Sequence, residues 1–132
     1  MTQHWRRSFV LIALVSSGCL PSCATYSGPV GAISNIVVGE AGSDSRNESC
    51  NGFSVSAADA KQFFRRAVLI TPRQEHDFYL HGPCYVRGTL STKYETWHWE
   101  IRNLGTARLT SEAGDDTFLL ADPRHESSLA DE

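Results

Sequence analysis

The stretch that decides the fold is residues 82–121, GPCYVRGTLSTKYETWHWEIRNLGTARLTSEAGDDTFLLA. Its clearest run is YETWHWEIR, residues 94–102, in which apolar and polar residues alternate as in a strand with one buried face. Gly88, in the preceding run, leaves room for an aromatic ring or for neighbouring backbone. We predict an antiparallel β meander with turns at 103–105 and 114–116. Its apolar face carries Trp97, Trp99 and Ile101.

One amphipathic helix is predicted before this meander. Ser56 is a suitable N-cap, and Asp59 occupies the position of the capping-box acid. Pro72 is expected to end the helix. Apolar residues recur with helical spacing at Ala60, Phe63, Phe64, Ala67 and Val68. The predicted fold class is α+β, with one N-terminal helix packed on the Trp97/Trp99 face of a small antiparallel meander of four or five strands.

Two cysteines flank the helix. Cys50 precedes it and Cys84 opens a strand, so a disulfide between them would join the helix to the sheet. Closing that loop is worth roughly 4 kcal/mol in chain entropy, which matters for a small core. The cysteines lack the close Cys-x-x-Cys spacing of zinc sites, and no metal or cofactor is expected. We predict the disulfide Cys50–Cys84.

Residues 1–23 have the three parts of a secretory signal peptide. Arg6 and Arg7 form the basic region, residues 9–15 form an apolar run, and small residues follow it. The arginine pair also matches part of a twin-arginine signal, which would export an already folded protein. The sequence therefore predicts export.

The end of this signal resembles the lipobox of bacterial lipoproteins, in which small residues precede a cysteine that becomes acylated. Gly18 before Cys19 fits the loose form of the motif, whereas Cys23 follows Pro21 and residue 22, Ser. Acylation of Cys23 would leave Cys50 and Cys84 as the remaining pair, but motif form favours Cys19. We predict lipidation of Cys19, with Cys23 as the alternative. Ordinary cleavage after residue 24 is a third interpretation and would release a soluble protein.

Composition divides the chain into four parts. Residues 1–23 are the signal peptide with its lipobox-like end, and 24–48 form a flexible tether that includes a candidate edge strand at 33–38. Residues 49–121 form the small α+β domain, and 122–132 form an acidic disordered tail.

Charge and compartment limit the partners. The formal net charge is −3, and it becomes −5 once Arg6 and Arg7 are removed with the signal. Nucleic acid is not expected to bind, because phosphate recognition needs a basic patch. We expect the protein in the bacterial cell envelope, on the periplasmic side of a membrane and held by a lipid anchor. The alternative is a soluble periplasmic or secreted protein.

Part of the meander resembles small uncharacterised bacterial envelope proteins. The resemblance rests on strand and turn positions and implies no particular activity. Its residues are Cys84-Tyr85-Val86-x-Gly88-Thr89, Trp97-x-Trp99-x-Ile101 and Gly105-Thr106-Ala107.

The polar face of the meander is the candidate binding surface. We expect an exported, non-enzymatic binding or accessory module whose partner is an envelope protein or a wall component, and no catalytic residue is assigned. The alternative is a small periplasmic hydrolase or metal-dependent enzyme that uses His81, His98 and Glu100. The residues of the candidate binding surface are Tyr85, Arg87, Tyr94, His98 and Glu100.

Overall fold

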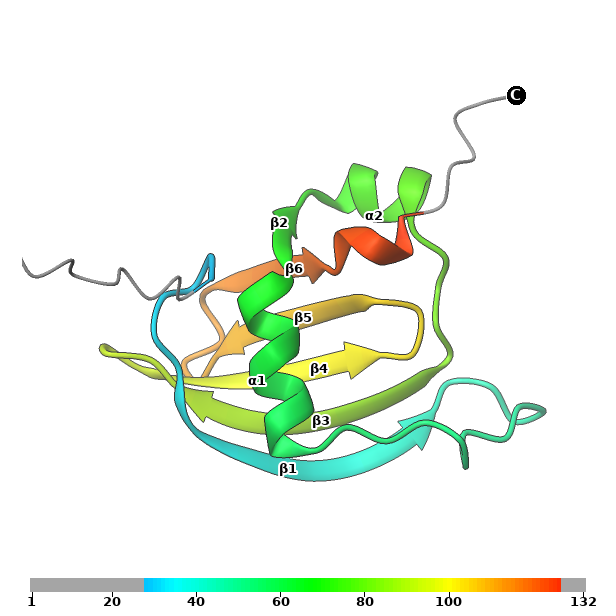
Figure 1. Ribbon diagram of the computed structural model, residues 1–132, viewed down its shortest axis with the longest axis horizontal. Coiled ribbons are helices and arrows are strands. Elements are labelled where there is room, and N and C mark those ends of the chain that lie inside the picture. The colour runs from blue at the N-terminus through cyan, green and yellow to red at the C-terminus, as the bar shows by residue number, and fades with distance from the viewer. Residues whose placement is uncertain (1–27, 127–132) are drawn as a thin grey trace, which may run out of the picture.

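A computed structural model describes residues 28–126, which form a six-stranded antiparallel sheet with short helices (Figure 1). The order of the strands across the sheet is β1-β3-β4-β5-β6-β2. The strands are β1 (Ser34–Ser43), β2 (Val68–Ile70), β3 (Cys84–Ser91), β4 (Thr96–Arg102), β5 (Thr106–Ser111) and β6 (Thr117–Ala121). The helices are α1 (Ala57–Arg66), α2 (Pro72–Phe78) and the 3-10 helix η1 (Pro123–His125).

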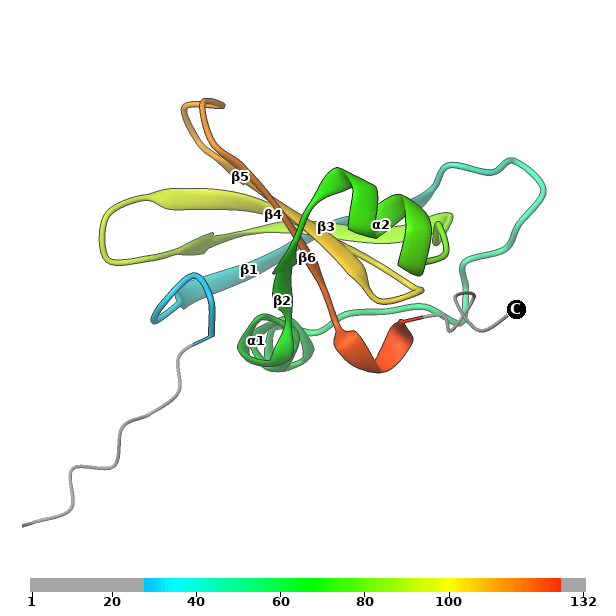
Figure 2. The ribbon, with the colours of Figure 1, turned by 90° about the horizontal axis from the view of Figure 1, so that it is seen from above.

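The hydrophobic core lies between α1 and one face of the sheet. In Figure 2, α1 lies on one side of the strands and α2 on the other. The ring centroids of Phe64 and Trp99 are 6.4 Å apart, in an edge-to-face arrangement. Trp97 and Trp99 are buried, as their alternation predicted. The largest fully buried side chains are Trp99, Phe64, Leu90, Leu109 and Leu120.

Both indole N–H groups of the core have partners. Trp97 Nε1 donates to Thr92 Oγ1 at 3.1 Å, and Trp99 Nε1 donates to the carbonyl oxygen of Thr89 at 3.0 Å. Trp99 lies opposite Gly88 on the neighbouring strand, where a Cβ atom would come within 2.4 Å of the indole ring. The absence of a side chain at Gly88 therefore makes room for Trp99, as the sequence predicted.

The fold-class prediction of one helix on four or five strands is wrong. The sheet has six strands, because β1 and β2 add one at each edge of the predicted meander. The additional helix α2 begins at the proline that was expected only to end α1. Thr71 and Gln74 form a capping box there, and proline suits the first turn because its missing N–H would have no helical partner.

Helix α1 is also shorter than its apolar stripe predicted. Ser56 and Asp59 form the expected capping box, but the helix ends at Arg66. Ala67 takes an extended backbone conformation, and the chain continues directly into β2. Val68 therefore belongs to an edge strand and is exposed, so its assignment to the buried stripe is wrong.

The fold extends beyond both expected boundaries of the α+β domain. Strand β1 lies within the expected tether at 24–48, where it includes most of the candidate edge strand at 33–38 and continues to Ser43, and it pairs with β3 along the edge of the sheet. Asp122, expected to open the disordered tail, is buried, and its carboxylate accepts a hydrogen bond from the backbone N–H of Arg124 in η1. Backbone pairing and this cap hold segments whose composition alone predicts little order.

The predicted disulfide Cys50–Cys84 is present, with the two Cα atoms 5.5 Å apart. It joins the loop before α1 to the first residue of β3. The predicted signal peptide and its candidate lipidation sites, Cys19 and Cys23, lie outside the described residues. Within residues 28–126, no helix is long and apolar enough to cross a bilayer.

Candidate functional site

The face of the sheet opposite α1 is polar, and α2 lies above only one end of it (Figure 2). We call this surface of β3, β4 and β5 the open face. Strand pairing arranges its side chains in three rows across the sheet. The rows are Tyr85 and Arg102, then Arg87, Glu100 and Arg108, then Thr89, His98 and Thr110.

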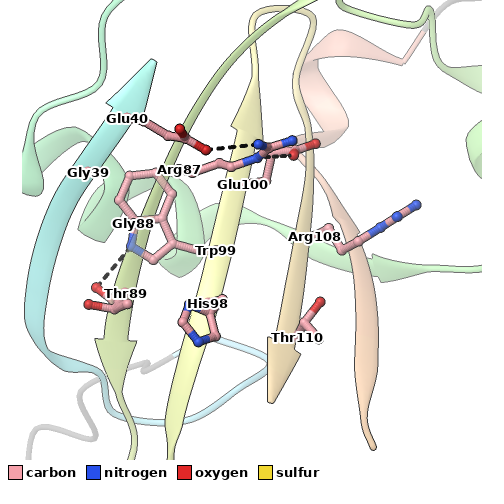
Figure 3. A pocket seen from close by; sticks show the side chains of 10 residues that line it. All are labelled: Gly39, Glu40, Arg87, Gly88, Thr89, His98, Trp99, Glu100, Arg108 and Thr110. Carbon is pink, nitrogen blue, oxygen red and sulfur yellow. Dashed lines mark hydrogen bonds and ion pairs between the residues drawn. The ribbon is translucent and has the colours of Figure 1, made fainter. Parts of the chain in front are cut away.

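Arg87 is held between two carboxylates from neighbouring strands (Figure 3). Its Nη1 lies 2.9 Å from Glu40 Oε1, and its Nε lies 2.8 Å from Glu100 Oε2. Glu40 comes from β1, which pairs with β3 on the side away from β4. These contacts therefore connect the polar side chains of three adjacent strands.

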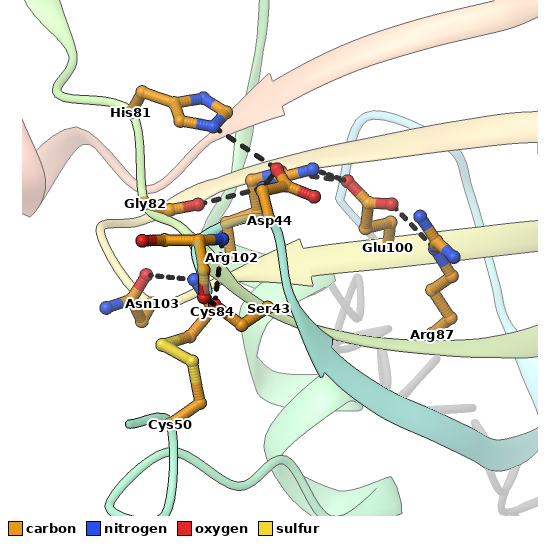
Figure 4. Close-up of polar contacts among 11 residues, drawn as sticks. Ser43, Asp44, Cys50, His81, Gly82, Cys84, Arg87, Glu100, Arg102 and Asn103 are labelled. Atoms are coloured by element: carbon orange, nitrogen blue, oxygen red, sulfur yellow. Dashed lines mark hydrogen bonds and ion pairs between the residues drawn. A yellow bond between two sulfur atoms is a disulfide. The ribbon is translucent and has the colours of Figure 1, made fainter. Parts of the chain in front are cut away.

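Arg102 extends the same network toward the start of β3 (Figure 4). Its Nη2 lies 2.8 Å from Glu100 Oε1, and its Nη1 lies 2.5 Å from Asp44 Oδ2. The same Nη1 donates to the carbonyl oxygen of Gly82 at 2.9 Å. His81 Nε2 lies 3.4 Å from the shared Asp44 oxygen. We call this series of connected side chains the charge ladder; in order of contact it consists of Glu40, Arg87, Glu100, Arg102, Asp44 and His81.

Two members of the charge ladder, Asp44 and Arg87, have pKa values shifted in favour of their ionised forms. The hydrogen bond from Arg102 lowers the pKa of the Asp44 carboxyl, and His81 adds to the effect. Hydrogen bonds to Glu100 and Glu40 raise the pKa of the Arg87 guanidinium. The Asp44 carboxylate and the Arg87 guanidinium are therefore held in their charged forms by their partners in the ladder.

Tyr85 supports both arginines of the ladder. The guanidinium carbon of Arg87 lies 4.1 Å from the centroid of the Tyr85 ring, and that of Arg102 lies 5.4 Å from it. The phenol ring also covers Gly42 of β1, where an added Cβ would come within 2.6 Å of the hydroxyl oxygen. Ring stacking and ion pairing together restrict the arginine side chains to one arrangement.

A groove of about 370 Å³ runs along the open face (Figure 3). Glu100 pairs with Arg108 in the register of β4 and β5, but both of its carboxylate oxygens are taken by Arg87 and Arg102. Among residues 28–126, the side chains of Arg108 and His98 have no ion-pair or hydrogen-bond partner. The groove thus combines a rigid charge ladder with an unpaired cation and an unpaired imidazole.

The structure places four of the five residues of the candidate binding surface on the open face: Tyr85, Arg87, His98 and Glu100. The fifth, Tyr94, lies in the turn between β3 and β4 and lines a different groove, at one end of the sheet.

The three residues of the alternative enzyme do not line one pocket. Glu100 borders two grooves: His98 lines the one on the open face but not its neighbour, and His81 lines the neighbour but not the one on the open face. The described part of the chain contains no cluster of three His, Cys, Asp or Glu side chains that could hold a metal ion. Both oxygens of Glu100 already accept from arginines, which occupies the atoms that a general base would use.

Several residues of the site were missed by sequence reasoning. Arg102 and Arg108 were visible as polar strand positions, but nothing in the sequence distinguished the arginine that is paired from the one that is not. Glu40 and Asp44 fell in the expected tether. The available signal was weak: the two acids follow the apolar run at 36–38 and are four residues apart, an even spacing that would place them on one face of an extended segment.

Comparison with protein-family models, with curated proteins and with solved structures finds no match for this chain. The proposed function therefore depends on the geometry of the open face and on the residue patterns of the sequence.

Proposed function

We propose that this protein is an exported, lipid-anchored component of the bacterial envelope that acts as a non-enzymatic binding module. Its open face is the surface that contacts the partner, which is another envelope protein or a wall component. Arg108 and His98 favour a partner that presents an acidic group at this point, because charge-assisted hydrogen bonds to carboxylates are the strongest available to them.

The proposal depends on one observation, that in the part of the chain that the structure describes two arginines of the open face are ion-paired and a third is not. Arg87 and Arg102 are neutralised by Glu40, Glu100 and Asp44, whereas Arg108 is not paired within the described residues. Complementary charge patterns determine specificity and register in protein recognition more than they determine affinity. A rigid ladder beside a free cation is suited to that role.

Two features support the envelope as the compartment. The disulfide Cys50–Cys84 is the kind of crosslink that persists in oxidising compartments and is rare in the cytosol. The basic, apolar and small-residue parts of residues 1–23 are typical of a secretory signal.

Partner capture from envelope extracts tests the open face. The tagged wild-type protein and the variant Arg108→Glu are compared, with Lys61→Glu as the matched charge reversal on the exposed side of α1. We expect a specific partner to be retained by wild type and by Lys61→Glu and to be lost from Arg108→Glu, because a carboxylate at position 108 repels an acidic group. Equal capture by all three proteins would show that the open face does not bind the partner.

Metabolic labelling with palmitate tests the anchor separately. Label is expected on the wild-type protein and is expected to vanish in Cys19→Ala. Persistence of the label in that variant, with loss in Cys23→Ala, would move the anchor to Cys23. An unlabelled wild-type protein would contradict the lipid anchor while leaving the open-face test unaffected.

A further inference from the structure

An apolar groove of about 250 Å³ lies at the end of the sheet where the described chain begins. We call it the end groove. In Figures 1 and 2, the first described residues and the β3–β4 turn lie at the same end of the molecule, and η1 lies toward the other. The residues that line the end groove include Pro29, Val30, Leu69, Tyr94, Trp97 and Phe118.

The end groove exposes aromatic and aliphatic surface that the fold does not use. Tyr94 is 86% exposed, Leu69 is 49% exposed and Phe118 is 38% exposed. The Phe118 ring lies 5.4 Å from that of Trp97, so the two form one apolar wall. Tyrosine and tryptophan with an apolar body and a polar tip are enriched where proteins meet the membrane–water interface.

Chain length places this groove close to the proposed anchor. Gly28, the first described residue, is nine positions after Cys19, and an extended chain of that length spans at most about 30 Å. Pro29 and Val30 follow at once and line the groove themselves. If Cys19 carries the lipid, the end groove is therefore the apolar surface that the tether holds nearest to the bilayer.

We propose that the end groove docks on the bilayer that holds the lipid anchor, with Tyr94, Leu69 and Phe118 entering the boundary between headgroups and acyl chains. This inference rests on the anchor proposed above. The lipid anchor holds the protein at the membrane, and a second apolar contact beside it orients the domain on the bilayer. Docking at this end leaves the open face, which lies along the side of the sheet, accessible to a partner.

The charges at this end determine the type of lipid. Lys93 is the cation of the β3–β4 turn, with its Nζ 5.3 Å from the centroid of the Tyr94 ring, and Glu95 lines the groove. The neighbouring β5–β6 turn carries three acids, Glu112, Asp115 and Asp116. Arg65, in the last turn of α1, lies beside Gly28 and adds a second cation. The four acids still outnumber the two cations, so docking favours zwitterionic phospholipid over an anionic surface.

Quenching of tryptophan fluorescence by brominated acyl chains tests the docking. The mature, acylated protein is reconstituted into phosphatidylcholine and phosphatidylethanolamine vesicles with and without bromine on the acyl chains. Removal of residues 1–18 would leave Trp97 and Trp99 as the tryptophans, and Trp97 lines the end groove. We expect quenching in wild type and loss of most of it in Leu69→Ser/Tyr94→Ser. Both substituted side chains are exposed, so this variant is expected to fold.

The matched control is Val37→Ser/Leu80→Ser, which removes two exposed apolar side chains that do not line the end groove. It is expected to be quenched like wild type. Vesicle flotation on the same samples separates the two proposals. Protein that floats with the vesicles without quenching, or with equal quenching in both double variants, overturns the docking and leaves the anchor intact. Acylated protein that does not float overturns the anchor and the docking with it.

Discussion

Gly88 has no room for a side chain. An added Cβ would lie 2.0 Å from the carbonyl oxygen of Val37 and 2.4 Å from the Trp99 ring, so β1 and the core indole would both have to move. We expect Gly88→Ala to lower the free energy of unfolding by about 1–3 kcal/mol, as overpacking does elsewhere. Urea denaturation measures this change. Gly52→Ala is the control, because a Cβ at Gly52 would have no neighbour within 4 Å; similar losses for the two variants would contradict the steric explanation.

Asp122 is a buried carboxylate held by arginines. Arg124 Nη2 donates to its Oδ2 at 2.6 Å, and Arg66 Nε lies 3.7 Å from the same oxygen. The hydrogen bonds from Arg124 lower the pKa of Asp122 below the value of about 3.9 expected in an unfolded chain. Because the unfolded state takes up the proton first, this stabilisation is present above about pH 4 and is lost as the pH falls through the lowered pKa.

Asp122→Asn removes the charge and keeps the shape of the side chain. We expect the variant to lose about 1–3 kcal/mol of unfolding free energy at neutral pH, as expected for hydrogen bonds to a charged group. The difference in unfolding free energy between the variant and wild type should shrink as the pH falls below about 4. In that range the wild-type carboxyl is protonated in the unfolded state, and the wild type loses the stabilisation that its charge provides. Denaturation at neutral and acidic pH measures this, with exposed Asp115→Asn as the control. A difference that stays constant with pH would mean that packing, and not charge, is lost.

Single residues also show what a sequence can and cannot predict about the site. The alternation in β4 predicted which side of the strand holds Trp97 and Trp99 and which holds His98 and Glu100. It could not predict which arginine would remain unpaired, because that depends on Glu40 in β1 and on Asp44 directly after it. The register shift between Val38 and Ala41 breaks the two-residue period that would have revealed Glu40 as a strand position.

The two helices have the same type of N-terminal cap but different tertiary support. Ser56 caps α1, which buries Ala60, Phe63 and Phe64, and Thr71 caps α2, which buries no residue. We expect Ser56→Ala to lower the global free energy of unfolding by about 1 kcal/mol, the usual cost of a lost cap. Thr71→Ala should act mainly by local fraying of α2. Denaturation combined with amide hydrogen exchange distinguishes the two effects, and equal global losses would show that α2 belongs to the cooperative core.

Elements were predictable where local pattern and tertiary role agree. Helix α1 and strands β3 to β6 follow their hydrophobic periodicity, whereas α2 has no apolar stripe and was missed. Strand β1 was predicted only in part: residues 33–38 were a candidate edge strand within the tether, and the strand continues to Ser43 through residues with little apolar surface. Its order comes from backbone pairing with β3, which is a tertiary interaction that composition does not report.

The disulfide bears on the stability of the whole molecule. It closes a loop between positions 34 residues apart, which corresponds to about 4 kcal/mol in the chain-entropy model. Domains of this size are typically stable by only about 5–15 kcal/mol, so the crosslink is a large share of the total. We expect Cys50→Ser/Cys84→Ser to lose about this amount in urea denaturation. Reductant should destabilise wild type to the same extent and leave the double variant unchanged. A reductant effect on the double variant would contradict the disulfide as the source of this stability.

At the scale of the whole molecule, the proposed surfaces do not overlap. The end groove lies where the described chain begins, and the open face extends along the side of the sheet opposite α1. A small domain can therefore be held at the membrane by one surface while it binds a partner through the other. The single sheet joins the two surfaces and keeps their relative orientation constant.

Photo-cross-linking in intact cells tests the central claim, that the open face is where the partner binds. A benzophenone amino acid is placed at position 108 on the open face or at position 61 on α1, both of which are exposed. We expect position 108 to form one specific adduct in the envelope and position 61 to form none. An adduct formed only from position 61, or no adduct from position 108, would contradict the assignment of the open face as the binding surface.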